Sequence, residues 1–257
     1  MFRMMSYSKQ VFQSSTQIIK RTNKTLAKFK LYQDNKSRNN DKMLTERHLR
    51  YIDMLNNDKY KILFAIGYPG TGKTRLSSQY AVQQLTRGNI EKVIITRPIV
   101  SLGGELGSLP GNMYEKMTPW IKPIDDCFLE YMSPITLTEL KKRNIIQISP
   151  LGYIRGLTFS NSVVIVDESQ NLTSAEFKCL LTRIGENCKM ILTGDTEQSD
   201  LNGQNGLVDF INRYKAYSSY RNNNYDEYED FIGLMQFLES DILRSGVAKQ
   251  IIKIYNY

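Results

Sequence analysis

Apolar residues fall into two patterns that alternate along most of this chain. Short uninterrupted apolar runs predict five buried strands, at 60–67, 92–96, 145–149, 162–166 and 189–193. Apolar residues that recur every three or four positions predict one helix before the first strand, at 45–56, and two between strands, at 74–86 and 174–184. Strands that are apolar on both faces are typical of a parallel sheet with helices on both sides. The pattern therefore predicts an α/β fold built on a mostly parallel sheet.

The other segments are less regular. Residues 99–134 are rich in Gly and Pro and predict irregular chain, apart from a helix at 123–131. The polar stretch at 212–230, which is rich in Tyr and Asn, predicts a surface loop. A further strand is expected at 231–238 and a helix at 241–255. The apolar face of that last helix would consist of Ile242, Val247, Ile251, Ile252 and Tyr255.

Positive charge is concentrated near the N-terminus. The chain has 257 residues and a net charge of +8, and residues 1–50 hold twelve of its 34 Lys and Arg but only three of its 26 Asp and Glu. Residues 1–40 therefore predict a flexible basic arm, and residues 41–257 a folded domain of nearly balanced charge. Three interpretations of this arm are open. It is either a solvated tail that has no specific partner, or a segment that binds nucleic acid, or an organelle transit peptide. The excess of Lys over Arg speaks against the transit peptide.

Several classes of protein are excluded by composition. No apolar run approaches the roughly 18 residues that a membrane-spanning helix needs, which excludes a channel or transporter. Three cysteines without a Cys-x-x-Cys pair predict neither a disulfide framework nor a zinc site, and favour a reduced, intracellular setting. With a single histidine, His48, a histidine-based catalytic triad is not expected.

The strongest chemical signal is a phosphate loop at 67–74. Its sequence, GYPGTGKT, fits G-x-x-x-x-G-K-[ST] in full and lies between an apolar strand and a helix. Glycines let backbone N–H groups close around a phosphate, and the helix N-terminus adds partial positive charge. Lys73 would reach the β- and γ-phosphates, and the Thr74 hydroxyl would bind Mg²⁺. The residues expected to contact a nucleotide are Gly67, Tyr68, Pro69, Gly70, Thr71, Gly72, Lys73, Thr74 and Arg75.

Two other strand ends carry polar residues that suit the same site. Asp167 and Glu168 follow the strand at 162–166; Asp167 would complete the metal site and Glu168 would polarise an attacking water. Because adjacent side chains on a strand point in opposite directions, we expect at most one of them to face the metal directly. The strand at 189–193 ends in Thr-Gly-Asp, and Gln198 beyond it could bond the γ-phosphate or the water. A simple turn is the alternative for this last segment.

Taken together, these motifs resemble the PhoH-like ATPases, a RecA-like P-loop family related to the motor domains of superfamily-one helicases. The resemblance spans roughly residues 44–255 and includes LPG…EKM…PW within 106–126, YIRGLTF at 153–159, DESQN at 167–171 and LTRIG at 181–185. It implies a single RecA-like domain with a nucleotide site formed by Lys73, Thr74, Asp167, Glu168 and Gln198.

The resemblance also draws attention to four other residues. Arg155, Arg183 and Arg244 match recurrent family arginines, one of which would contact the γ-phosphate of a neighbouring subunit; a structural ion pair is the alternative for each. His48 stands where relatives commonly carry a Gln that is similar to the adenine-reading glutamine of helicases. His48 is therefore a candidate contact of the base.

The activity implied by the resemblance is Mg²⁺-dependent ATP hydrolysis on or with RNA or single-stranded DNA. Its catalytic residues would be Glu168, Lys73, Gln198 and Arg244. It implies a homo-oligomer, with a hexamer as one option, no membrane association, and a place in the cytoplasm of a bacterial cell or of a phage's host. Two alternatives stay open: an ATP-gated nucleic-acid-binding module with negligible turnover, and a small-molecule kinase.

Overall fold

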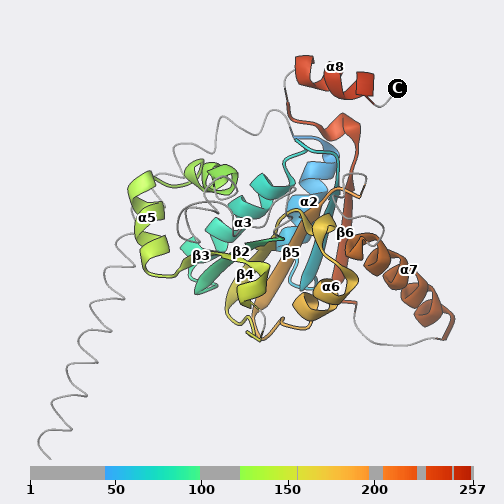
Figure 1. Cartoon of the computed structure of the whole chain (residues 1–257), viewed down its shortest axis with the longest axis horizontal. Coiled ribbons are helices and arrows are strands. Elements are labelled where there is room, and N and C mark those ends of the chain that lie inside the picture. The colour runs from blue at the N-terminus through green and yellow to red at the C-terminus, as the bar shows by residue number, and fades with distance from the viewer. Residues whose placement is uncertain are drawn as a thin grey trace, which may run out of the picture.

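The computed structural model of the chain describes six segments (Figure 1): 44–98, 122–154, 156–196, 205–224, 230–244 and 246–255. The expected basic arm at 1–40 lies outside the described residues, as do most of the Gly- and Pro-rich stretch, Arg155 and Gln198. None of the described helices is long and apolar enough to cross a membrane.

Six strands form one sheet in which every pairing is parallel, so the expected α/β fold is confirmed. The strand order is β3-β2-β4-β5-β1-β6. The strands are β1 Ile62–Gly67, β2 Lys92–Arg97, β3 Ile146–Pro150, β4 Ser162–Val166, β5 Cys188–Gly194 and β6 Ile232–Phe237. The central strands β4 and β5 are buried along their whole length, which explains why apolar residues dominate their sequences.

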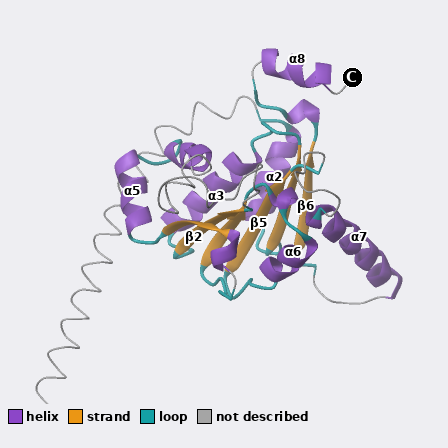
Figure 2. Cartoon of the chain, in the orientation of Figure 1, coloured by secondary structure: helices purple, strands orange, loops and turns teal. Residues whose placement is uncertain are grey.

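Helices cover both faces of the sheet (Figure 2). On one face, α2 Glu46–Asn56, α3 Lys73–Arg87, a helix at 122–129 and α5 Pro134–Lys142 pack on alternate strand residues such as Leu63 and Ile165. On the other face, α6 Ser174–Leu181 and α7 Gly206–Asn224 pack on the intervening residues, such as Phe64 and Val164. Alternate residues of one strand thus feed two separate hydrophobic cores.

Two expectations for the C-terminal third were wrong. The stretch at 212–230 is not a surface loop over most of its length, because α7 continues to Asn224. Only the first half of α7 carries core residues, and its later turns are polar, which hides the helical pattern. The last helix, α8, begins at Gly246 rather than at 241, after a 3₁₀ turn at Glu239–Asp241. Its Val247 and Ile251 are exposed, whereas Ile242, before the helix, is buried.

Because the strands are parallel, their carboxyl ends meet at one edge of the sheet. Thr96 of β2 pairs with Val166 of β4, and Val166 pairs with Leu192 of β5. The residues that follow each of these positions, Arg97, Asp167 and Thr193, are therefore brought side by side. This is the edge at which open α/β sheets bind their ligands.

Candidate nucleotide-binding site

The phosphate loop connects β1 to α3 at the carboxyl edge of the sheet. Gly67 has a φ of +132°, and a Cβ at this position would lie 2.1 Å from the carbonyl oxygen of Phe237 in β6. Any side chain would therefore force the loop away from the edge strand. Gly72, with a φ of +77°, is the N-cap of α3, so the first N–H groups of that helix face the loop.

Lys73 is held by the loop itself. Its Nζ donates to the carbonyl oxygens of Gly67 and Tyr68, the latter at 2.7 Å, and its side chain is only 9% exposed. Burial lowers the pKa of Lys73, and the carboxylates of Asp195, Glu168 and Asp167 oppose that shift. The ammonium group therefore lies in a negative surrounding, bonded to carbonyl oxygens that phosphate oxygens could replace.

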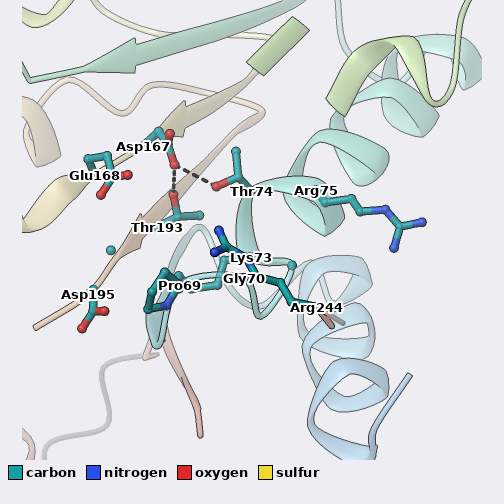
Figure 3. Close-up of a pocket in the computed structure, with 12 residues that line it drawn as sticks. Pro69, Gly70, Lys73, Thr74, Arg75, Asp167, Glu168, Thr193, Asp195 and Arg244 are labelled. Atoms are coloured by element: carbon teal, nitrogen blue, oxygen red, sulfur yellow. Dashed lines mark hydrogen bonds between the residues drawn. The ribbon is translucent and has the colours of Figure 1, made fainter. Parts of the chain in front are cut away.

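Asp167 joins three elements at the tip of β4. Its Oδ1 accepts hydrogen bonds from the hydroxyls of Thr74 in α3, at 2.8 Å, and Thr193 in β5, at 2.7 Å (Figure 3). Its backbone N–H donates to the carbonyl of Thr96 at 2.9 Å. The carboxylate is thus fixed beside the hydroxyl that the phosphate-loop pattern assigns to the metal.

Glu168 faces the same cavity as Asp167, which the alternation of side chains on a strand did not predict. Its φ of +53° and ψ of +43° place it in the left-handed region, so the chain turns sharply where β4 ends. For a residue with a side chain this conformation costs on the order of 1–2 kcal/mol and persists only where neighbours impose it. The turn is what brings both carboxylates into one site.

A cavity of about 280 Å³ collects most of the expected residues. Figure 3 shows them around the loop and the tips of β4 and β5. Its lining consists of Pro69, Gly70, Gly72, Lys73, Thr74, Arg75, Asp167, Glu168, Thr193, Gly194, Asp195 and Arg244. Gly67, Tyr68 and Thr71 belong to the loop but not to this lining, and Thr71 is fully buried.

His48 does not lie in the cavity, so its expected contact with the base is corrected. The ring is fully buried in α2 beneath the phosphate loop. Its Nε2 lies 2.9 Å from the carbonyl oxygen of Thr71, and its Nδ1 accepts the backbone N–H of Thr45 at 3.0 Å. Both ring nitrogens are therefore engaged within the protein, and His48 supports the loop rather than reading an adenine.

The candidate arginines have different surroundings. Arg75 extends away from the loop (Figure 3), and its Nε donates to Glu130 at 2.6 Å, so the guanidinium belongs to an ion pair. Arg244 packs on the loop of its own chain, where its Nε would lie 2.6 Å from a Cβ on Gly70. Arg183 follows α6 and donates to the carbonyl of Cys179 at 3.2 Å, while its own carbonyl accepts from Phe159 shortly before β4 begins. It therefore lies at the opposite end of the sheet.

Arg97 is a site residue that sequence reasoning missed. Its Nη2 donates to Glu168 at 3.3 Å, and its Nη1 lies 4.0 Å from Asp167 Oδ2. One sequence signal was its position at the end of a buried strand, and that signal becomes informative once β2 is known to lie next to β4. Gln170 was missed as well: it is 3% exposed and its Nε2 donates to Glu168 at 2.6 Å.

The residues present fit a magnesium-bound nucleotide. Mg²⁺ prefers hard oxygen ligands and is usually held by one or two carboxylates together with substrate phosphates. Asp167, Thr74 and Thr193 supply a carboxylate and two hydroxyls at one point, beside a loop whose backbone suits phosphate. Within the described residues there is no group of three or more His, Cys, Asp or Glu that could hold a metal ion.

The parallel sheet and this loop, with a lysine, a threonine and a strand-tip aspartate, define a P-loop protein of the ATPase type. The chain belongs to the PhoH family, whose sequence model, described as PhoH-like protein, matches residues 42–256. The resemblance inferred from the motifs is thereby confirmed.

Three relatives show the extent of the similarity. A PhoH-like protein of Synechocystis sp. is 43% identical over 157 residues, which are 61% of this chain and 47% of that protein. A PhoH-like protein of Bacillus subtilis is 38% identical over 205 residues, 79% of this chain and 60% of that protein. Protein PhoH of Escherichia coli is 32% identical over 215 residues, 82% of this chain and 57% of that protein. This chain thus spans only 47% to 60% of the length of these relatives.

A solved structure is similar at a greater distance. The SWI2/SNF2 ATPase core of Sulfolobus solfataricus in complex with dsDNA aligns with 59% of this chain and 32% of its own, with a TM-score of 0.39 and 13% identity. A likeness this distant carries no functional argument.

Proposed function

We propose that this chain binds ATP with Mg²⁺ and hydrolyses it by attack of water on the γ-phosphate. The observation that carries the proposal is the meeting of Thr74, Thr193 and Asp167 Oδ1 beside Lys73, with Glu168 on the wall of the same cavity. A metal-binding carboxylate and a second, separately held carboxylate are the two acids that such a reaction uses.

Each residue has a role that follows from its position. The loop N–H groups and Lys73 would hold the β- and γ-phosphate oxygens, with Nζ exchanging its carbonyl partners for them. Thr74 and Asp167 would hold the metal ion, which neutralises charge on the phosphates when bound. Glu168 would accept a proton from the attacking water, and Gln198, which lies outside the described residues, would orient that water.

Substitution of the proposed base tests this mechanism. Glu168→Gln should still bind ATP but lose roughly 10²- to 10⁴-fold in phosphate release, because an amide cannot accept the proton. Glu139→Gln is a matched control, since Glu139 is exposed on α5 and its carboxylate pairs with Arg143, away from the cavity. Equal turnover in wild type and Glu168→Gln would remove Glu168 from the mechanism. If even the wild type releases no phosphate, yet ATP alters its nucleic-acid binding, the chain is an ATP-gated binding module.

We further propose that ATP turnover is coupled to RNA or single-stranded DNA. The support is the charge of residues 1–50, where twelve basic residues stand against three acidic ones. Contacts with on the order of six phosphates would give a log–log salt slope near −4. Deleting residues 1–40 should weaken the binding of a labelled oligonucleotide at least about tenfold at low salt and leave basal ATPase unchanged. An unaltered affinity and salt slope would exclude the arm as a nucleic-acid contact.

A homo-oligomer, including a hexamer, stays a prediction. The position of Arg244 supports action within its own chain, because the neighbouring Leu243 N–H donates to the Gly70 carbonyl at 2.9 Å. Mixing Lys73→Met with Arg244→Ala subunits separates the two cases. Recovered ATPase activity in the mixture would show that an arginine acts across a subunit boundary; no recovery supports action within one chain.

A further inference from the structure

The carboxylate of Glu168 is held at both oxygens, each by a different element. Oε1 accepts from Arg97 Nη2 at 3.3 Å, and Oε2 accepts from Gln170 Nε2 at 2.6 Å. The Glu168 side chain is 37% exposed, so burial alone would not confine it to one rotamer. The two donors therefore determine where the carboxylate points.

Gln170 connects this carboxylate to the tip of β5. Its Oε1 accepts the backbone N–H of Asp195 at 3.1 Å, while its Nε2 donates to Glu168. A flipped amide would place its NH₂ against an N–H and its oxygen against a carboxylate, and both contacts would be repulsive. The amide can therefore satisfy both neighbours in only one orientation.

The Gln170 side chain is buried and lies close to the end of β5. The side chain is 3% exposed, in the 3₁₀ turn Ser169–Asn171 that follows β4. A Cβ on Gly194 would lie 2.9 Å from Gln170 Oε1. A glycine at the end of β5 is what lets the two strand tips approach closely enough for this bond.

We propose that Gln170 is a positioning residue that couples the tip of β5 to the orientation of Glu168. Thr193, Gly194 and Asp195 line the nucleotide cavity, so a phosphate that shifts this strand tip would also move the Asp195 N–H. The rigid amide passes that movement to the carboxylate of Glu168. This proposal rests on the proposed hydrolysis, because it assigns to Gln170 the task of aiming the base.

Two substitutions of Gln170 test the coupling. Gln170→Glu is nearly isosteric and keeps an acceptor for Asp195 N–H, but it turns an oxygen toward Glu168. Gln170→Met keeps the length and removes both bonds. Both should lower kcat, by up to about 10²-fold since small misplacements of a reacting group are costly, with KM for ATP within about twofold. Ser169→Ala is the matched control: it lies in the same buried turn, and among the described residues its hydroxyl has no hydrogen-bond partner.

The pH profile separates positioning from structural damage. In Gln170→Glu the introduced carboxyl can donate to Glu168 only when it is protonated. Its kcat relative to wild type should therefore rise as the pH falls from about 8 to about 6, whereas the ratio for Gln170→Met should stay flat. Thermal melting of each variant checks its folding, and Gln170→Met carries the test if Gln170→Glu does not fold.

The possible outcomes distinguish this proposal from the hydrolysis itself. Wild-type turnover that is lost in Glu168→Gln but unchanged in both Gln170 variants would overturn the coupling alone. A second outcome would also overturn the coupling and make Gln170 a packing residue. In that case melting temperature, kcat and ATP affinity would fall together, and the kcat of Gln170→Glu relative to wild type would not depend on pH. Absence of phosphate release in the wild type would overturn the hydrolysis and this inference together.

Discussion

Lys73 and Lys189 are both buried, 9% and 6% exposed, at opposite ends of the sheet. Each ammonium donates to two backbone carbonyls: Lys73 to Gly67 and Tyr68, and Lys189 to Leu55 and Asn57. Burial lowers the pKa of both lysines. By burial, hydrogen bonding and direction of pKa shift, the two residues look alike.

Their partners differ. Lys189 binds the carbonyl of Leu55, in the last turn of α2, and that of the C-cap residue Asn57. The last carbonyls of a helix have no partner within it, and α2 has no basic residue in its own last turn. Lys73 instead binds a glycine-containing loop that opens onto a cavity with three acids. Lys189 is thus a helix cap supplied by a distant strand, whereas the bonds of Lys73 can be exchanged for ligand. A buried lysine indicates function only where its partners are replaceable.

The largest expected effect is on Lys73. Lys73→Met should lower phosphate release by about 10²- to 10³-fold, because it removes a preorganised positive charge from the phosphate site. Binding of a fluorescent ATP analogue should weaken as well. The urea midpoint should change little, because the lost hydrogen bonds are offset by removal of a charge that is costly to bury. Retained nucleotide binding would show that the ammonium is as structural as that of Lys189.

Lys189→Met should produce the opposite result. It removes the Lys189 donor from the carbonyls of Leu55 and Asn57, the second of which keeps the Tyr60 N–H, and this loss should lower the free energy of unfolding by about 1–2 kcal/mol. ATP turnover per folded molecule should not change. Urea unfolding measures the first quantity, and Lys92→Met, which removes an exposed lysine at the start of β2, is the control for loss of a lysine charge. A stable variant with impaired turnover would contradict the assignment of Lys189 as a cap.

The pH dependence of stability sharpens the comparison. Burial is the main reason that the pKa of Lys189 is lowered from 10.5 to about 8. Between these values the folded protein has released a proton that the unfolded chain still holds, so the free energy of unfolding rises with pH. Between about pH 7.5 and 9.5, the free energy of unfolding of the wild type should therefore rise by on the order of 1 kcal/mol relative to that of Lys189→Met. Parallel pH curves for the two proteins would contradict this expectation.

The smallest effect is expected for Arg75. The Arg75–Glu130 pair is partly exposed, 25% and 38%, and such pairs contribute at most about 1 kcal/mol. Arg75→Ala should therefore change the urea midpoint slightly and KM for ATP by less than about twofold. A large rise in KM would mean that Arg75 leaves Glu130 to bind nucleotide. Arg75 would then resemble Lys73, whose partners can be replaced by a ligand.

The parts of the site that lie within one short segment of the chain could be predicted from the sequence. The phosphate loop, its flanking strand and helix, and the acids at 167 and 168 were all predicted from short patterns. The helix α5 was missed although it carries local signals: Ser133 as N-cap, proline at its first position, and lysines in its last turn. Its neighbourhood, rich in Gly and Pro, obscured them.

Features that depend on strand order could not be predicted. Arg97 meets Asp167 only because β2 lies beside β4, and Gln170 reaches Asp195 only because β4 lies beside β5. The left-handed turn at Glu168 likewise overrides the alternation of side chains that a strand implies. His48 shows the same limit, since only the fold reveals that α2 places it beneath Thr71.

The bond from Leu243 to Gly70 has a consequence for the order of synthesis. The loop is made early, yet the segment that closes over it comes after every strand of the sheet. On the ribosome, where earlier parts of a chain fold first, β1 and its loop would wait for β6 and for the residues through Arg244. A nascent chain would thus contain all of the phosphate-loop sequence long before the segment that closes over the loop has been made.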